Sequence, residues 1–578
     1  MTSRSNPFEF SGANDLPADM VLDYYIEDFN YSRFLQSKRN ILLVGERGCG
    51  KSMTLLYNSW PIRRLKAIQE STLAPFDHVG IYVPCNTPLI HKDEHQLFDE
   101  SLASILAEHS LVISLLFEIA RTLAEDESIM KDADEELLRT RLEFILDEDL
   151  TPSVPFFQCI QDFAQRVNLK TQQHLSRGKS SERIYGETYS FSSLILPFLG
   201  LTRFIPAVQK THFMFLIDDA QYLNQHQLAS LCSWIAYRDH SLFSFKVAMA
   251  SIAESKLHTA SGGSILEGHD YLQLDMVQPF QNEMSDFGRL AEGLVTKRFK
   301  RFSIESSPED FFPISKQLRE ELAESESSVR KDAEKLYGSD TRRVSDYVYK
   351  HKRAHYFRNR PPHANLPEYS GFQTLVFLST GVIRNLLTPP HAMYDKMLSR
   401  ASNSNLRKIE CIPPRIQSEV VLEQSRKLWD RLREGIDKNI VGCSSEDALR
   451  CYQLLDQLAF LFRRRLLEHE SEPCANSFTI SSKTHASWAE LERLVNILRE
   501  AQLLYRRSGS AKDKGKREWY YVPNRLLWPV RGLDPHGQHA RVSLRASDLW
   551  AAADQNCEIP FRNSGDPESL WSLLDDTN

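Results

Sequence analysis

The strongest constraint on the fold is the segment NILLVGERGCGKSMTLL, which begins at Asn40. Its Ile41–Val44 part is a continuous apolar run with the length of a buried parallel strand. The octapeptide GERGCGKS follows at once and fits the pattern GxxxxGK[ST] at every fixed position. A strand, a glycine-rich loop and a helix in this order form a phosphate-binding loop, so the sequence predicts a nucleotide site on an α/β sheet.

Each residue type in this loop has a physical task. Glycines let successive backbone N–H groups turn inward and wrap phosphates with no Cβ in the way. Lys51 can reach the β- and γ-phosphates, and the Ser52 hydroxyl can ligate Mg²⁺. The helix that starts at Lys51 places its positive end under the same phosphates. The predicted nucleotide contacts are Gly45, Glu46, Arg47, Gly48, Cys49, Gly50, Lys51, Ser52 and Met53.

Two further strands are expected to end beside this loop. The apolar run Phe213–Ile217 is followed by Asp218 and Asp219, and ligands bind at the C-terminal edge of parallel sheets. Asp218 is therefore predicted to hold Mg²⁺ through water, and Asp219 to polarise the attacking water. A helix N-cap is the alternative interpretation of the paired acids. The run Phe245–Ser251 ends in Ser251, which either contacts the γ-phosphate or is an ordinary serine at a strand end.

The order of these segments is that of a known family. GERGCGKS, FLIDDAQYL and KVAMAS resemble Walker A, Walker B and sensor 1 of AAA+ ATPases. The later segment FLSTGVIRNLL, from Phe377, looks like the sensor 2 helix of the AAA+ lid, in which Arg384 points back to the nucleotide. The chain thus resembles the origin-recognition/Cdc6-like ATPases and their signal-transducing STAND relatives. The resemblance implies an ATPase that uses ATP and Mg²⁺, with catalytic residues Lys51, Asp218, Asp219, Ser251 and Arg384.

The sequence departs from that family at three points. The lid reads Gly-Val-Ile-Arg where the family usually has Gly-Asn-Pro-Arg, and the Walker B acids are Asp-Asp where it has Asp-Glu. The shorter Asp219 holds its carboxylate farther from the water, which implies slow hydrolysis. No arginine lies between Ser251 and the expected strand Tyr271–Asp275, where a ring ATPase supplies its arginine finger. A nucleotide-gated switch therefore fits better than a hexameric motor.

The length of 578 residues predicts several domains, because a single hydrophobic core stops growing at about 250–300 residues. We expect a parallel α/β P-loop NTPase sheet with a helical insertion and a helical lid, followed by a C-terminal winged-helix domain. The insertion, at about 96–209, either decorates the core or contacts a partner. The expected domains are the ATPase core at 1–300, the lid and linker at 301–440, the winged helix at 441–545 and an acidic flexible tail at 546–578.

The predicted winged helix carries a basic wing. Helical patterns over Ala448–Glu468 and Trp488–Ala501, a short strand at Phe478–Ile480 and a hairpin around SGSAKDKGKR are typical of that fold. Between Leu503 and Arg531, eight cations face two acids, although the whole chain has a net charge of −7. Such a wing suits duplex DNA, and protein docking is the alternative. The candidate DNA contacts are Arg506, Arg507, Lys512, Lys514, Lys516 and Arg517.

A second basic segment lies in the excursion from Ser315 to Glu368. It ends in YKHKRAHYFRNRPPH, where cations alternate with aromatic residues. Phosphate contacts combined with base stacking would bind nucleic acid there. A solvated surface of the lid is the alternative interpretation.

Composition limits the remaining classes. Hydrophobic residues make up 42% and charged residues 25%, as in ordinary globular proteins, and the start MTSRSNPFEF lacks a secretory signal. We expect a cytoplasmic protein with no membrane partner. Two functions stay open: an ATP-dependent switch that engages double-stranded DNA, and a STAND-like signalling ATPase, for instance in antiviral (anti-phage) defence, that docks a protein effector. Homo-oligomerisation is possible in either case.

Overall fold

The computed structural model describes residues 6–9, 12–27, 31–72, 76–86, 90, 98–177, 188–236, 242–250, 257–276, 286–360, 366–400, 409–468, 474–510, 517–537 and 540–561. By its internal contacts the chain divides into two units. The first is Gly12–Met276, and the second combines Met1–Ser11 with Val277–Asn578. The division falls earlier than the predicted core boundary at residue 300.

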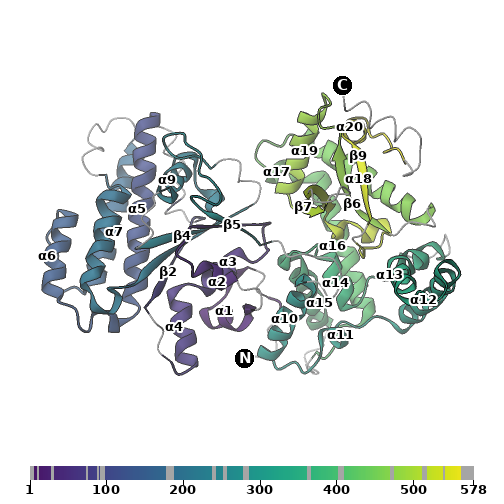
Figure 1. Cartoon of the computed structure of the whole chain (residues 1–578), viewed down its shortest axis with the longest axis horizontal. Helices are drawn as coiled ribbons and strands as arrows, with labels where there is room; N and C mark the ends of the chain where they lie inside the picture. Colours follow the sequence, from purple (N-terminus) through teal and green to yellow (C-terminus); the bar gives the residue numbers. More distant parts are fainter. Residues whose placement is uncertain are drawn as a thin grey trace. The chain divides into compact units, whose positions relative to one another are not determined.

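The first unit is built on a five-stranded sheet in the order β2-β3-β4-β1-β5, in which all neighbours are parallel (Figure 1). This order brings the carboxyl ends of β1 and β3 to the same edge, one on each side of β4. Every residue of β1, β3 and β4 is buried, as their apolar sequences predict. The strands are β1 Ile41–Val44, β2 His78–Pro84, β3 His212–Asp218, β4 Phe243–Met249 and β5 Leu272–Asp275.

Helices cover both faces of this sheet. The segment predicted as a helical insertion is helical, and its longest helix, α5, begins where the Asp99 side chain accepts the Leu102 N–H at 3.0 Å. Among the described residues α5 alone is long and apolar enough to cross a membrane, yet 67% of its apolar window is buried inside the unit. The helices are α1 Ala18–Tyr24, α2 Tyr31–Leu35, α3 Lys51–Tyr57, α4 Trp60–Gln69, α5 Glu100–Ala124, α6 Glu135–Leu146, α7 Phe156–Arg177, α8 Leu196–Leu201 and α9 Gln225–Ile235.

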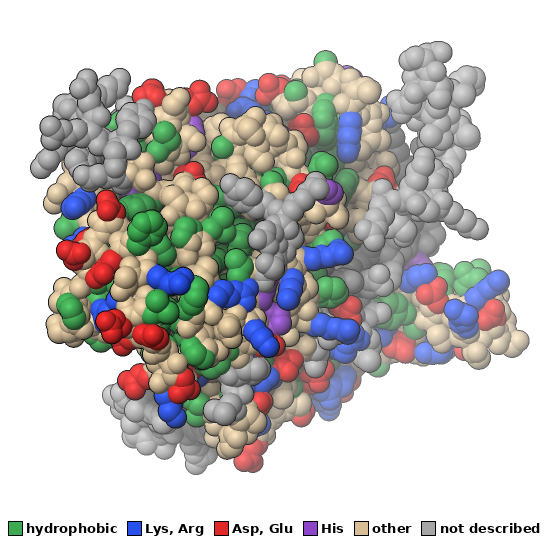
Figure 2. Space-filling model, turned by 60° about the vertical axis from the view of Figure 1, so that its left-hand side comes forward, with side chains coloured by type: hydrophobic (Ala, Val, Ile, Leu, Met, Phe, Trp, Pro, Cys, Tyr) green, Lys and Arg blue, Asp and Glu red, His purple; other side chains and the backbone are tan. Residues whose placement is uncertain are grey.

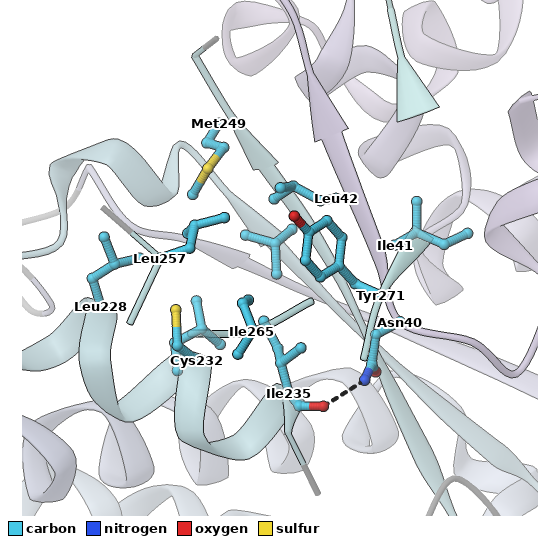
Figure 3. A pocket seen from close by; sticks show the side chains of 12 residues that line it. Asn40, Ile41, Leu42, Leu228, Cys232, Ile235, Met249, Leu257, Ile265 and Tyr271 are labelled. Carbon is cyan, nitrogen blue, oxygen red and sulfur yellow. Dashed lines mark hydrogen bonds between the residues drawn. The ribbon is translucent and has the colours of Figure 1, made fainter. Parts of the chain in front are cut away.

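Asn40, directly before β1, ties several of these elements together. Its amide nitrogen donates to the Ile235 carbonyl at 2.9 Å and to the Asp270 carbonyl at 3.1 Å, and its side-chain oxygen accepts the Phe245 N–H at 2.9 Å. Beside it, a cavity of about 10 Å³ lies between α9 and the sheet (Figure 3). Its lining is almost wholly apolar, so this layer is close-packed and dry.

The second unit starts with helices of the lid. The N-terminal segment belongs to it: Phe8 is fully buried against Phe299 and Phe312, and Arg298 donates to the Pro7 carbonyl at 3.0 Å. Phe299 lies on α10, so this helix packs on the N-terminal segment within the second unit. The helices are α10 Asp286–Arg301, α11 Pro308–Phe311, α12 Lys316–Tyr337, α13 Thr341–Arg358, α14 Phe372–Leu378, α15 Ile383–Arg400 and α16 Pro414–Glu434.

The predicted winged-helix fold is confirmed. A hairpin of β7 and β8 joins β6 and β9 in the order β7-β8-β6-β9, with β6 and β9 parallel and the other pairs antiparallel. The elements are α17 Ile436–Asn439, α18 Ser445–Glu468, β6 Ala475–Ser481, α19 Trp488–Glu500, β7 Leu504–Ser510, β8 Arg517–Pro523, β9 Ala540–Arg545 and α20 Ala546–Gln555.

The expected flexible tail at 546–578 is wrong for its first part. Residues 546–555 form α20, which buries Ala546, Leu549 and Ala552 in the core of the winged helix. These apolar residues recur at helical spacing, and that periodicity outweighs the acidic composition of the segment. Residues 562–578 lie outside the described residues.

Candidate nucleotide and DNA sites

The loop after β1 has the backbone of a phosphate cradle. Gly48 and Gly50 adopt φ of +85° and +103°, a region that residues with a Cβ rarely enter. A Cβ on Gly45 would lie 2.8 Å from the Cys49 Sγ and 3.2 Å from the Met276 Cβ. The glycines of the motif are thus required by conformation and by space. Backbone N–H groups at the start of α3 are oriented for an anion.

Lys51 is held across this loop. Its side chain is buried, and the Nζ donates to the carbonyls of Gly45 at 2.8 Å and Glu46 at 3.0 Å. The ammonium is therefore fixed beside the cradle at the first turn of α3. The Arg47 guanidinium lies 5.6 Å from the centre of the Tyr222 ring, just beyond β3.

Ser52 and Asp218 meet at the end of β3. Asp218 is 1% exposed, and its carboxylate accepts the Tyr82 hydroxyl at 2.7 Å and the Ser52 hydroxyl. Burial raises the pKa of Asp218, and the charge of Asp219 raises it further, whereas Tyr82, Ser52 and Lys51 act in the opposite direction. A hydroxyl beside a carboxylate is the hard oxygen donor set that Mg²⁺ takes, and the cation would favour the ionised acid. The residues present therefore fit Mg²⁺ with a triphosphate.

Asp219 occupies a left-handed backbone position, with φ of +56°. Its carboxylate accepts Gln221 Nε2 at 2.9 Å and Asn86 Nδ2 at 3.4 Å. The Gln221 Oε1 in turn accepts the Ala250 N–H at 3.2 Å, directly after β4. Gln221 thus connects the second acid to the strand that leads into the predicted sensor 1.

Sequence reasoning missed Tyr82, Asn86 and Gln221. For Tyr82 a signal existed, because Ile81 and Val83 beside it face the opposite side of the sheet, so that Tyr82 shares the face of the P-loop helix. Gln221 lies within the quoted segment FLIDDAQYL, three residues after the first acid.

Two predicted catalytic residues cannot be joined to this site. Ser251 lies outside the described residues. Arg384 lies in the second unit, exposed in the first turn of α15. The segment predicted as one sensor 2 helix is in fact a junction: α14 ends at Leu378, and Thr380 and Gly381 have φ of +57° and +78° before α15 begins. The roles of Ser251 and Arg384 stay predictions.

A comparison with known protein families agrees with three features of this site: the strand order of the sheet, the phosphate cradle and the paired acids. The sequence model of the ORC-CDC6-like family matches residues 6–338 and 314–544. The chain belongs to the ORC-CDC6-like family. Its members are AAA+ ATPases, which use a nucleotide and Mg²⁺.

Two solved structures are similar at low identity. Cdc6p from Pyrobaculum aerophilum is 12% identical with a TM-score of 0.30, over 95% of this chain and 96% of that one. The Orc1 protein of Aeropyrum pernix, solved in complex with DNA, is 11% identical with a TM-score of 0.27, over 92% and 97% of the two chains. No curated protein matches the sequence.

In the described part of the wing, a half-buried cation of this ORC-CDC6-like chain lies over an exposed aromatic ring. The Arg506 guanidinium lies 4.3 Å from the centre of the Trp519 ring, and Trp519 is 48% exposed. Arg507 points elsewhere, since it donates to the Thr380 carbonyl at 3.4 Å. Lys512, Lys514 and Lys516 lie outside the described residues, as does the side chain of Arg517.

Two of the eight cations counted in this region have structural roles. Arg525 is 1% exposed, donates to the carbonyls of Pro535 at 2.7 Å and Gly537 at 2.8 Å, and burial lowers its pKa to about 10. Arg531 forms an ion pair with Asp456. The charge excess predicted for the wing is therefore smaller than the composition suggests.

The helix before the wing is acidic on its outer face. Glu490, Glu492 and Glu500 are exposed on α19. Of its two cations Arg499 is buried, and the exposed Arg493 forms ion pairs with the buried Asp447 and with Glu490. A helix with this charge would be repelled by the phosphates that flank a major groove. Of the described surface, the hairpin of β7 and β8 is thus the better candidate for DNA.

The second predicted nucleic-acid segment is disfavoured. It forms the end of α13, where Tyr356 and Phe357 are buried and cannot stack on bases. Its cations pair within the unit, including Lys350 with Asp346 at 2.6 Å and Lys352 with Glu326 at 3.2 Å.

Proposed function

We propose that the chain is an AAA+ switch that binds ATP with Mg²⁺, hydrolyses it slowly and engages double-stranded DNA through the hairpin of β7 and β8. The observation that carries the nucleotide half is the meeting of the Ser52 hydroxyl and the Asp218 carboxylate beside Lys51. Lys51 and Ser52 lie at the start of α3 and Asp218 lies at the end of β3, and their meeting at a loop with two left-handed glycines supports a phosphate and a metal as ligands.

Slow turnover is supported by the second acid. The carboxylate of Asp219 is one methylene shorter than the Glu that usually stands there, and two amide donors hold it. Each amide occupies a carboxylate lone pair that the attacking water would otherwise use.

The DNA half is supported by the pair of Arg506 and Trp519. An arginine stacked on an indole presents both a phosphate-binding cation and an apolar surface on one strand pair. A basic wing of this kind contacts the DNA backbone without base specificity.

A second candidate follows from the acidic face of α19. Three exposed glutamates suit a basic protein surface better than DNA. In that case the chain is a STAND-like signalling ATPase that controls a protein effector, and antiviral defence is one setting for it.

The deciding experiment measures ATP hydrolysis by the full chain with and without duplex DNA, beside a Lys51→Ala control. Under the switch proposal, DNA raises a rate that depends on Lys51. Arg506→Glu should weaken duplex binding about tenfold and lower the slope of log affinity against log salt by about 1–2, since a charge reversal removes one phosphate contact and adds one repulsion. The matched control is Lys316→Glu, a charge reversal at a side chain that is 90% exposed on α12. Equal effects of the two variants would refute the DNA assignment and favour the effector.

A further inference from the structure

A large cavity lies in the first unit, beside the candidate nucleotide site. Its volume is about 850 Å³, within the range of small-molecule sites. Its walls come from α1, α3, α4, the end of β2, α5 and α7. None of the residues that line it belongs to the phosphate loop, so it is distinct from the cradle. Figure 2 brings forward the side on which α5, α6 and α7 lie in Figure 1, and hydrophobic side chains gather there among charged ones.

Most of the cavity wall is apolar. Val21, Ile62, Ile113 and Phe117 come from four different helices and line it. A wall of this kind favours a ligand with a hydrocarbon or ring-containing body.

The charged groups of the wall lie on one helix. Among the described residues of the lining, Glu118, Arg121 and Glu125 are the charged ones, and they come from the C-terminal part of α5 and its C-cap. Arg121 pairs with Glu118 at 2.6 Å. Burial raises the pKa of Glu118, Arg121 opposes this shift and the charge of Glu125 adds to it. Burial also raises the pKa of Glu125, and there Arg121 and Arg64 both oppose the shift. Among the described lining residues two carboxylates thus stand beside one guanidinium, an arrangement that favours a cationic group over an anionic one.

Two polar side chains of the cavity wall also donate hydrogen bonds to the Walker B acids. Tyr82 and Asn86 line the cavity, and the same two side chains donate to Asp218 at 2.7 Å and to Asp219 at 3.4 Å. The Tyr82 hydroxyl also lies 3.0 Å from Asn14 Oδ1, on the segment that closes the cavity. A molecule that displaces these side chains changes the hydrogen bonds of both acids.

We propose that this cavity binds a small organic cation with a ring-containing apolar body, and that its occupancy is transmitted to Asp218 and Asp219 through Tyr82 and Asn86. The binding half stands on the cavity alone. The transmission half rests on the proposed nucleotide site. The two carboxylates disfavour an anionic ligand, and a purely apolar one leaves the amides and hydroxyls of the rim without partners.

Binding is tested on the full chain by calorimetric titration with tryptamine, and with tryptophol as its uncharged counterpart of the same shape. A probe of this size binds with a Kd of about 1 mM. We expect tryptamine to bind about tenfold more tightly than tryptophol. Glu118→Gln should abolish that difference, whereas Glu136→Gln, an exposed change on α6, should keep it. Ser114→Trp, which occupies part of the cavity, should weaken the binding of both probes.

Equal affinity for the two probes, or an unchanged difference in Glu118→Gln, would overturn the proposal. So would competition between tryptamine and ATP, because it would make the cavity part of the nucleotide site. Circular dichroism of each variant shows whether the fold is kept, and tryptophol binding to Glu118→Gln reports an intact cavity.

Transmission is measured as the change in ATP affinity when tryptamine saturates the cavity. At least a threefold change is expected, with a smaller one in Tyr82→Phe. If ATP binds with unchanged affinity, transmission is refuted while the site stands. If ATP does not bind at all, the proposed function fails and tryptamine binding still decides the cavity.

Discussion

A buried ion pair fastens the α12–α13 hairpin to the winged helix, and removing its cation gives a sharp test of the packing. Asp534 is 1% exposed and accepts Arg353 through two nitrogens, with distances of 2.9 Å to each oxygen. The His536 ring lies 2.9 Å from the same carboxylate. Burial lowers the pKa of His536 to about 4, and the Arg353 charge contributes to this shift.

The change Arg353→Met keeps the length of the side chain and removes the charge. Breaking a buried pair from one side costs about 3–5 kcal/mol, because the remaining charge is left in a poor dielectric. Arg353 is 22% exposed and His536 keeps its contacts, so the lower end, about 3 kcal/mol, applies. That loss equals roughly a hundredfold fall in hydrogen-exchange protection.

The pH dependence follows from His536. In the native chain its folded pKa of about 4 lies below the unfolded value of 6.5, so the unfolded state takes up the proton first. Protection of this region should therefore fall as the pH drops from about 6.5 to 4. Without Arg353 the pKa of His536 rises, and the protonated ring can neutralise Asp534. The cost of Arg353→Met should thus be smaller at pH 5.5 than at pH 8.

The assay is hydrogen exchange with mass spectrometry on peptides that cover α13 and residues 529–537, corrected for intrinsic rates. A local measurement is needed because one unfolding free energy is not defined for a chain of several units. Adding Asp534→Asn to Arg353→Met should restore part of the protection, since it removes the stranded charge. A double variant as unprotected as Arg353→Met, or a single variant that loses less than fivefold, would refute the buried-charge argument.

Three further changes test other parts of the structure. Gln221→Leu should slow single-turnover ATP hydrolysis at least tenfold, because Asp219 loses a positioning donor, while ATP affinity stays within twofold. Equal losses in hydrolysis rate and in ATP affinity would contradict this role. Burial lowers the pKa of Lys246 to about 7, below its unfolded value of 10.5, so the native chain should gain thermal stability over Lys246→Met as the pH rises from 7 to 10. Asn40→Ala should lower the hydrogen-exchange protection of β1 and β4 by about 3 kcal/mol, since it removes the partner of three backbone groups, two of them in buried bonds and one in a partly buried bond. A loss below about 1 kcal/mol would argue against that estimate.

The sequence predicted correctly those parts of the site whose residues follow one another in the chain. The strand, the loop and the helix of the phosphate site are contiguous, and their spacing alone predicts the geometry seen at Gly48, Gly50 and Lys51. The strands of the first sheet, the strands β6, β7 and β8 of the second, and the helices α18 and α19 were likewise predicted from apolar patterns, whereas β9 and α20 were not. The tail failed because composition was weighed above the periodicity of Ala546, Leu549 and Ala552.

Contacts between distant segments could not be predicted in this way. Tyr82 and Asp218 are 136 positions apart, and only the pairing of β2 with β3 brings them together. Counting charges also overestimated the positive charge that the wing exposes. A count does not separate solvated cations from cations that form contacts inside the domain. Arg525 and Arg531 were counted with the wing, yet one satisfies buried carbonyls and the other an aspartate.

The same distinction decides how this winged helix can approach a duplex. Its two exposed elements carry opposite charges: glutamates on α19, and the pair of Arg506 and Trp519 on the hairpin. Phosphates attract the second and repel the first, so electrostatics turns α19 away from the groove as the hairpin approaches the backbone. Contact through the hairpin alone involves few phosphates, so affinity should be modest and independent of base sequence. The acidic face of α19 then stays accessible on the DNA-bound chain, and a basic protein could bind there at the same time. The two candidate functions therefore use different faces of one domain and need not exclude each other.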